Sequence, residues 1–260
     1  MQGAWRYRQR RRGHRLSEPA SLPDGFPRRG GPQVIPRPQA WRLGPGAPWG
    51  RPDGRRPDRI SVTDVRSALI RRGEPPLAPV DDLPLLALPG SARPPAAVLC
   101  LLFDWEGQCR LVLTRRSSRM RSHSHQVSFP GGRLEPGEEL SGAALREAQE
   151  EVGIDPAGVE IIGRLSSLST VLNPSPITPF VGVAGERPRL HPNPAEVERA
   201  FDVALVELLD PEVYREELWT FPDGSERSMA FFELMGDTVW GATARMLVEL
   251  IDLVVDHTAF

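Results

Sequence analysis

The segment that most constrains this chain is an acidic one, GRLEPGEELSGAALREAQEEVGI at residues 132–154. Its apolar residues recur at helical spacing and predict a helix over residues 140–151. On that helix Glu147, Glu150 and Glu151 are three and four positions apart, so their carboxylates share one face and repel one another. Mg²⁺ and Mn²⁺ prefer oxygen ligands and would reverse that repulsion. The face predicts a divalent-metal site, and an ordinary solvated acidic face is the alternative.

Glycine-containing turns stand before the predicted helix. Residues 128–132, SFPGG, predict a short strand that ends in Gly131 and Gly132, where bare backbone can approach an anion. Residues 136–137, Pro-Gly, predict a second turn. Arg146 is the cation nearest to the three glutamates, but it directly precedes the first of them and is expected to point away from the cluster.

The segment resembles the Nudix box, which is written G-x5-E-x7-R-E-U-x-E-E-x-G-U with U an aliphatic residue. Its aliphatic positions hold Ala148 and Ile154. The resemblance implies an α/β/α sandwich with a mixed sheet, a metal centre on a loop-helix-loop, and hydrolysis of a nucleoside diphosphate linked to another group. The invariant positions of the motif are all filled in this chain, by Gly132, Glu138, Arg146, Glu147, Glu150, Glu151 and Gly153.

The same resemblance implies roles for individual residues. Glu147 and Glu151 are expected to be the principal ligands of Mg²⁺ or Mn²⁺, and Glu150 a further ligand or a contact to the attacking water. Glu138 and Arg146 complete the expected catalytic set as orienting partners. Bound metal neutralises the diphosphate and lowers the pKa of a water molecule. The identity of the general base stays open.

The sequence upstream, LTRRSSRMRSHSHQVSFPGG, is similar to the signature of the coenzyme A pyrophosphatase branch, L-L-T-x-R-S-x3-R-x3-G-x3-F-P-G-G. Val112 replaces its first leucine, and His125 stands where the signature has glycine. Arg116 and Arg121 are expected to bind phosphate groups, since a guanidinium pairs with two oxygens at once. The matching residues are Leu113, Thr114, Arg116, Ser117, Arg121, Phe129, Pro130, Gly131 and Gly132, and the last two are also expected to contact substrate.

The implied reaction is hydrolysis of coenzyme A or acyl-coenzyme A to adenosine 3′,5′-bisphosphate and (acyl-)4′-phosphopantetheine. One alternative is a pyrophosphohydrolase for another nucleoside diphosphate derivative, such as an ADP-sugar or a dinucleotide. The other is a nucleotide-sensing regulator without catalysis. The preferred acyl chain, the preferred metal and the oligomeric state stay open.

Glu196 has two interpretations. In HPNPAEVERAF it is a candidate fourth carboxylate near the metals. Alternatively, Asn193, Pro194 and Glu196 fit the N-cap, N1 and N3 positions of a capping box that begins a helix.

The rest of residues 60–260 predicts one α/β domain. Apolar runs predict strands at residues 96–103, 110–114, 159–165 and 177–183, and helical spacing predicts helices at residues 62–72 and 238–255. The turn-like DWEGQ predicts a hairpin in which Cys109 faces Asp104, so no disulfide is expected.

Residues 1–59 are expected to be a disordered tail. They hold 14 Arg, 4 acidic residues, 10 Pro and 9 Gly without apolar periodicity. Three interpretations stay open: an inert extension, a basic arm for anionic surfaces, and upstream sequence included by a mis-assigned start, since Val62 opens the first helix. Deletion of the tail is expected to be neutral.

Composition limits the cellular setting. Every one of the 32 basic residues is Arg, which fits the codon supply of a GC-rich genome and indicates no nucleic-acid partner. No membrane-spanning stretch and no signal-peptide core are expected. The sequence predicts a cytoplasmic protein whose partner is a small nucleotide substrate.

Overall fold

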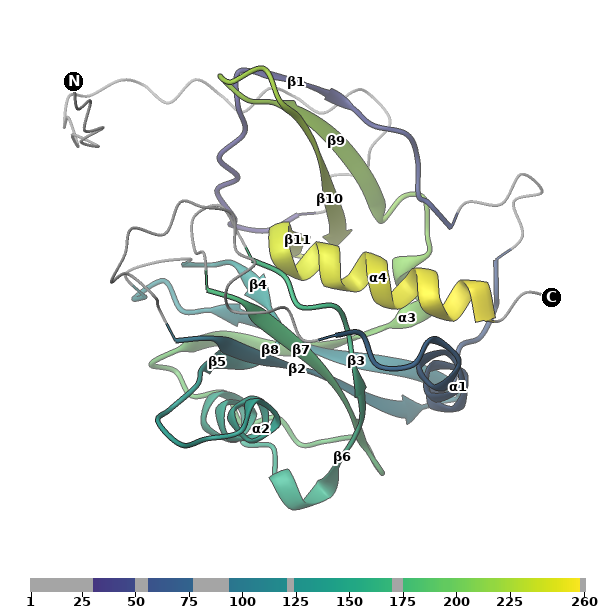
Figure 1. Cartoon of the computed structure of the whole chain (residues 1–260), viewed down its shortest axis with the longest axis vertical. Helices are drawn as coiled ribbons and strands as arrows, with labels where there is room; N and C mark the ends of the chain where they lie inside the picture. The colour runs from purple at the N-terminus through teal and green to yellow at the C-terminus, as the bar shows by residue number, and fades with distance from the viewer. Residues whose placement is uncertain (1–29, 50–55, 77–93, 121–123, 170–174, 258–260) are drawn as a thin grey trace.

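The computed structural model describes residues 30–49, 56–76, 94–120, 124–169 and 175–257. Two sheets and the helices between and beside them make up this part of the chain (Figure 1). None of its helices has the length and apolarity needed to cross a membrane.

A mixed seven-stranded sheet forms the centre of the protein, in the order β4-β3-β2-β7-β6. Strand β2 pairs in parallel with β7 and antiparallel with β3, and β5 and β8 add to β2 and β3 respectively. The β2–β3 turn places Glu106 and Gly107 at positive φ, as a type I′ hairpin requires, and Cys109 faces Asp104 as predicted. The strands are β2 (Ala96–Trp105), β3 (Gln108–Arg116), β4 (Val127–Ser128), β5 (Gly131–Arg133), β6 (Val159–Arg164), β7 (Ile177–Ala184) and β8 (Val197–Ala204).

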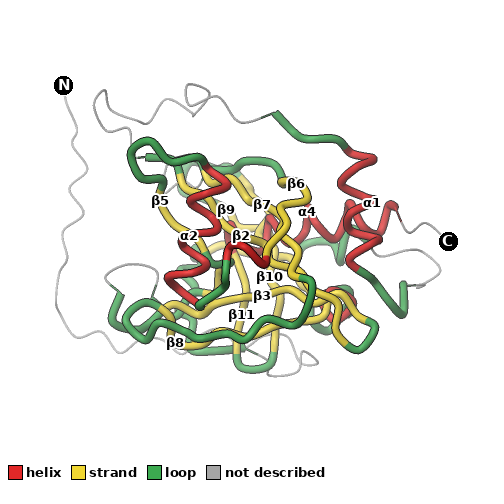
Figure 2. The backbone as a smooth tube through the Cα atoms, turned by 90° about the horizontal axis from the view of Figure 1, so that it is seen from below, coloured by secondary structure: helices red, strands yellow, loops and turns green. Residues whose placement is uncertain are grey.

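Helices cover both faces of this sheet. Helix α2 (Leu140–Val152) packs on one face, where Ala144 and Ala148 meet Leu99 and Leu101 of β2. Helices α1 (Val62–Arg72), α3 (Leu205–Leu208) and α4 (Gly241–His257) lie on the other face. Figure 2, seen from the α2 side, shows α1 and α4 beside each other. The predicted mixed α/β fold with helices on both faces is confirmed.

A second sheet, absent from the sequence prediction, packs on the far side of α4. Its order is β1-β9-β10-β11 and all of its pairs are antiparallel. Helix α4 buries Leu250 and Ile251 in a core that also holds Leu111 of the central sheet and Phe232 of the second one. The strands are β1 (Ala40–Leu43), β9 (Tyr214–Thr220), β10 (Glu226–Leu234) and β11 (Asp237–Trp240).

The expectation of a disordered tail is wrong for residues 30–49. Strand β1 pairs with β9, and the buried Trp49 lies with its ring centroid 4.7 Å from that of Tyr214. The composition of this segment indicated disorder because the segment has almost no core of its own. It is ordered because it joins a core supplied by residues 213–240. Residues 1–29 and 50–55 lie outside the described part of the chain.

The helix that the capping-box interpretation of Glu196 would begin does not form, and part of the last predicted helix is a strand. Residues 197–204 are strand β8, which pairs with the edge of β3 after a single turn in which Asn193 Oδ1 accepts from Ala195 N. Residues 238–240 belong to β11, and the last helix begins at Gly241, whose φ is +65°.

Candidate active site

The glycine pair of β5 brings the backbone against the carboxylates of α2. Gly131 N donates to Glu151 Oε2 over 3.2 Å. A Cβ atom at Gly132 would lie 2.3 Å from the carboxylate carbon of Glu147, and one at Gly131 would lie 2.4 Å from the carbonyl oxygen of Ala97. The glycines therefore approach the carboxylates of Glu147 and Glu151. Any side chain at Gly131 or Gly132 would collide with a neighbouring atom.

Glu151 is the most buried of the three glutamates, with 2% of its surface exposed. Its pKa is raised to about 7, chiefly by burial; the Arg116 guanidinium and the Gly131 N–H oppose this shift, and the charges of Glu147 and Glu196 add to it. The guanidinium of Arg116 lies 3.6 Å from Glu151 Oε1. The Glu151 carboxylate is thus removed from water and experiences the negative charges of Glu147 and Glu196. Arg116 is the cation close to it.

Arg146 does not point away from the glutamates, and the prediction that it would is wrong. Its Nη1 donates to Glu147 Oε1 and to Glu150 Oε2, each over 3.0 Å, and its Nε donates to Glu138 Oε1 over 2.9 Å. Its long stem reaches across the helix face, and Nη2 also donates to the carbonyl of Arg133. Hydrogen bonding to Arg146 lowers the pKa of Glu138, so this pair holds the loop before α2 against the helix.

Glu147 and Glu150 differ in their surroundings. Burial raises the pKa of Glu147, with Arg146 opposing that shift. The side chain of Glu150 is 55% exposed and turns toward Arg146. The structure therefore separates the three glutamates of the helix into two inward ones, Glu147 and Glu151, and an outward one.

Glu196 lies at the same site rather than in a helix cap. The residues before it form turns that lead into β8, so the capping-box interpretation is wrong. The backbone carbonyl of Glu196 accepts from Ser117 N over 2.7 Å, next to Arg116. Its charge raises the pKa of both Glu147 and Glu151. Glu196 therefore stays a candidate fourth carboxylate of the site.

The donor set fits a hard divalent cation. Within the described residues, no three His, Cys, Asp or Glu side chains converge closely enough to form a ready-made metal centre. Glu147, Glu151 and Glu196 nevertheless supply oxygen atoms only, Glu151 is buried, and the charges of Glu147 and Glu196 raise the pKa of Glu151. Mg²⁺ and Mn²⁺ match oxygen donors of this kind and relieve such repulsion.

His125 occupies a position whose backbone favours glycine. Its φ is +60°, which accounts for the glycine that the coenzyme A pyrophosphatase signature has there. Its Nδ1 lies 2.8 Å from Glu198 Oε2. Arg121 falls in residues 121–123, outside the described part of the chain. Sequence reasoning missed Glu198, because no motif marks a residue that acts on a turn so distant in the sequence.

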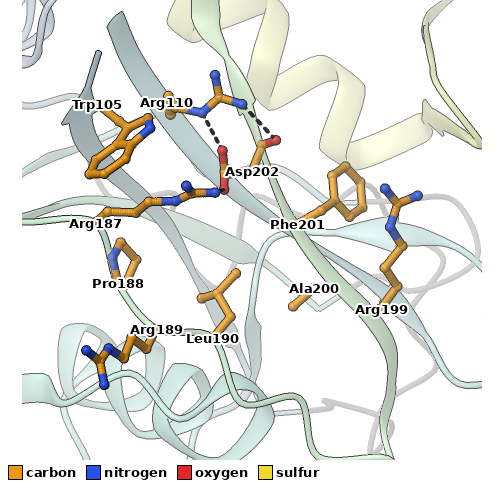
Figure 3. A pocket seen from close by; sticks show the side chains of 10 residues that line it. All are labelled: Trp105, Arg110, Arg187, Pro188, Arg189, Leu190, Arg199, Ala200, Phe201 and Asp202. Atoms are coloured by element: carbon orange, nitrogen blue, oxygen red, sulfur yellow. Dashed lines mark hydrogen bonds and ion pairs between the residues drawn. The ribbon is translucent and has the colours of Figure 1, made fainter. Parts of the chain in front are cut away.

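A groove of about 680 Å³, separate from the carboxylates, lies beside β3 and β8 of the central sheet and is lined by four arginines and one aspartate (Figure 3). Arg110 and Arg187 both pair with Asp202, and the Arg187 guanidinium lies 5.1 Å from the centre of the Trp105 ring. Strand β8 connects the two places, since Val197 pairs with Arg116 and Asp202 pairs with Val112. The lining contains none of the predicted site residues, and its cations are partly neutralised; the residues are Trp105, Arg110, Arg187, Pro188, Arg189, Leu190, Arg199, Ala200, Phe201 and Asp202.

Comparison with known proteins adds a family. The model of the NUDIX domain matches residues 93–218. Nudix hydrolase 22, chloroplastic, from Arabidopsis thaliana is 38% identical over 168 residues, which cover 61% of this chain and 55% of that protein. The chain thus spans about half the length of this plant relative.

Two bacterial relatives are covered more fully. The uncharacterized Nudix hydrolase NudL of Photorhabdus laumondii is 38% identical over 141 residues, or 54% of this chain and 74% of that protein. NudL of Pectobacterium atrosepticum is 36% identical over 176 residues, or 64% and 88% respectively.

Proposed function

Since the chain belongs to the Nudix hydrolase family, we propose that it is a metal-dependent pyrophosphohydrolase that cleaves coenzyme A or acyl-coenzyme A. The products are adenosine 3′,5′-bisphosphate and (acyl-)4′-phosphopantetheine. The observation that carries the proposal is the buried carboxylate of Glu151, which lies between the Gly131 N–H and the guanidinium of Arg116. The site thereby combines metal-binding oxygens with a phosphate-binding cation.

The chemistry is divided among the residues of this site. Glu147 and Glu151, with Glu150 or Glu196 as a further ligand, would hold Mg²⁺ or Mn²⁺, which would supply charge neutralisation and an activated water. Gly132 gives the carboxylate of Glu147 its place against the strand, because any side chain there would fill that place. Arg146 orients the acidic face through its bonds to three glutamates, Glu138, Glu147 and Glu150.

Arg116 is assigned to the diphosphate. Its guanidinium lies 3.6 Å from Glu151 Oε1, so it could pair with a phosphate oxygen of a substrate bound beside that carboxylate. The 3′-phosphate, which distinguishes coenzyme A from its 3′-dephospho form, is left to Arg121. The support for coenzyme A itself is the signature at residues 112–132, in which Arg116 and Arg121 are both kept.

A substrate panel tests this proposal. Purified protein is incubated with Mg²⁺ or Mn²⁺ and coenzyme A, acetyl-coenzyme A, dephospho-coenzyme A, ADP-ribose or a diadenosine polyphosphate, and products are identified by mass spectrometry. Adenosine 3′,5′-bisphosphate is the expected product, and Glu151→Gln is the control that should not form it. Turnover of ADP-ribose or the dinucleotide without turnover of coenzyme A would replace the proposed substrate. Binding without any turnover would favour a nucleotide-sensing regulator.

A further inference from the structure

The place of Arg116 depends on the turn between β3 and β4. Arg116 N donates to the carbonyl of Gln126 over 2.9 Å, and His125 N donates to the carbonyl of Arg116 over 3.1 Å. His125 therefore closes the turn, and it does so at a φ of +60°. A non-glycine residue keeps such a conformation only when its surroundings hold it there.

The N-terminal segment supplies part of that hold. Gln33 Nε2 donates to the carbonyl of His125 and to Asp237 Oδ1, each over 2.9 Å. Gln33 Oε1 accepts from Thr238 N over 3.0 Å. Both ends of one amide are thus engaged between the β3–β4 turn and the start of β11.

Asp237 anchors the same junction from the second sheet. Its carboxylate is fully buried and accepts from Arg115 Nη1 over 3.0 Å and from Arg199 Nη1 over 2.9 Å. Arg115 directly precedes Arg116, and its other nitrogen, Nη2, lies 3.3 Å from Glu198 Oε1. The β10–β11 hairpin is therefore fastened to β3 near its last residue, Arg116, and to β8 near its first residue, Val197.

We propose that Gln33, supported by Asp237, is a positioning residue that holds His125 in its left-handed conformation and so places Arg116 beside Glu151. Gln33 and Asp237 both lie outside residues 93–218, which match the family model. The N-terminal segment and the second sheet then belong to the working site, although neither touches substrate. This inference rests on the proposed function, in which Arg116 binds the diphosphate.

The test uses full-length variants and two readouts. Gln33→Met removes the hydrogen bonds of Gln33 at nearly constant size. Arg42→Gln is the matched control, because Arg42 lies on the same N-terminal segment and its side chain forms an exposed ion pair with Glu226. We measure steady-state kinetics on the substrate that the panel yields, and the affinity for ADP with Mn²⁺ by calorimetry. Gln33→Met should raise KM and the Kd of ADP by about 10-fold, with kcat within about twofold of wild type. Arg42→Gln should change neither.

A glycine rescue separates positioning from general destabilisation. Glycine adopts positive φ freely, so the turn should no longer need Gln33 once His125 is replaced. In a His125→Gly background, Gln33→Met should therefore change KM by less than about twofold. Hydrogen exchange at the amides of Arg116 and His125 should rise in Gln33→Met and fall back in the double variant.

Several outcomes would overturn the proposal. Equal KM and ADP affinity in Gln33→Met and wild type would do so, as would full additivity with His125→Gly. If Gln33→Met does not fold, Gln33→Asn replaces it, because the amide is kept but is one methylene further from the carbonyl of His125; an unchanged KM there contradicts the proposal. Hydrolysis of no panel substrate, with ADP affinity lowered as expected, removes the proposed function alone. Absence of any diphosphate binding by wild type removes both.

Discussion

Replacing Gly132 by alanine should abolish most activity and leave the fold intact. The new Cβ atom would lie 2.3 Å from the carboxylate carbon and Oε1 of Glu147. Ordinary carbon contacts begin near 3.5 Å, so the carboxylate must move by roughly 1 Å. The obstacle is the free end of a flexible side chain, and its displacement costs the fold little. A misplacement of this size costs about 100-fold in rate at a catalytic site.

The neighbouring glycine provides a matched contrast. A Cβ atom at Gly131 would lie 2.4 Å from the backbone carbonyl of Ala97 and 2.6 Å from Val98 Cα, so the β2–β5 pairing itself would have to shift. Overpacking against backbone costs about 1–3 kcal/mol of the free energy of unfolding. Gly131→Ala should therefore lower the denaturation midpoint, which Gly132→Ala should not.

Both variants are assayed by urea unfolding and by kcat/KM at saturating Mn²⁺. If Gly132→Ala keeps wild-type kcat/KM, activity does not depend on the position of the Glu147 carboxylate beside Gly132, and the prediction is refuted. Equal instability of the two variants would also refute it. A collision with a movable side chain, at Gly132, would then cost as much free energy of unfolding as a collision with backbone, at Gly131.

Three further perturbations test other parts of the structure. Glu151→Gln should reduce kcat/KM by 100-fold or more, about 3 kcal/mol, without unfolding the protein; near wild-type turnover at saturating metal would refute the assignment. Burial raises the pKa of Asp252 to about 6, so its carboxylate destabilises the fold increasingly as pH rises from about 4 to 6 and fully above that. Asp252→Asn should thus add about 1 kcal/mol of unfolding free energy at pH 8, a value reduced for partial solvent screening, and nothing at pH 4; equal effects at both would contradict the cause. Deleting residues 1–59, first expected to be neutral, should lower stability by about 3 kcal/mol, because Trp49 leaves its contact with Tyr214; an unchanged urea midpoint would show otherwise.

The elements that the sequence predicted well are those with a strong local pattern. Helices α1 and α2 and strands β2, β3, β6 and β7 carry clear apolar periodicity, and they form at the expected places. Strands β8 and β11 lack such a pattern. The state of β8 is decided by its pairing with β3, which is distant in sequence, and that of β11 by its pairing with the preceding strand β10. The same limit hid β1, whose partner β9 begins at residue 214.

The candidate site shows the same division. Spacing on one helix was enough to bring Glu147 and Glu151 together, and the glycine pair indicated a close backbone approach. Spacing gave the wrong direction for Arg146. Its Cα lies off the acidic face of the helix, but its long flexible side chain reaches back to Glu147 and Glu150. Glu198 and Gln33 had no local signal at all, since each acts through a hydrogen bond to a turn far away in the chain.

The position of α4 between the two sheets bears on how this protein is made. The ribosome completes every strand of both sheets before α4, residues Gly241–His257, is synthesised. Until then the apolar surfaces that Leu247, Leu250 and Val254 will cover stay open on each sheet. A nascent chain with two uncovered apolar faces is exposed to aggregation and to chaperone binding. Folding of this protein on the ribosome therefore waits for α4, and a chain terminated before residue 241 should be captured by chaperones rather than accumulate as a smaller folded domain.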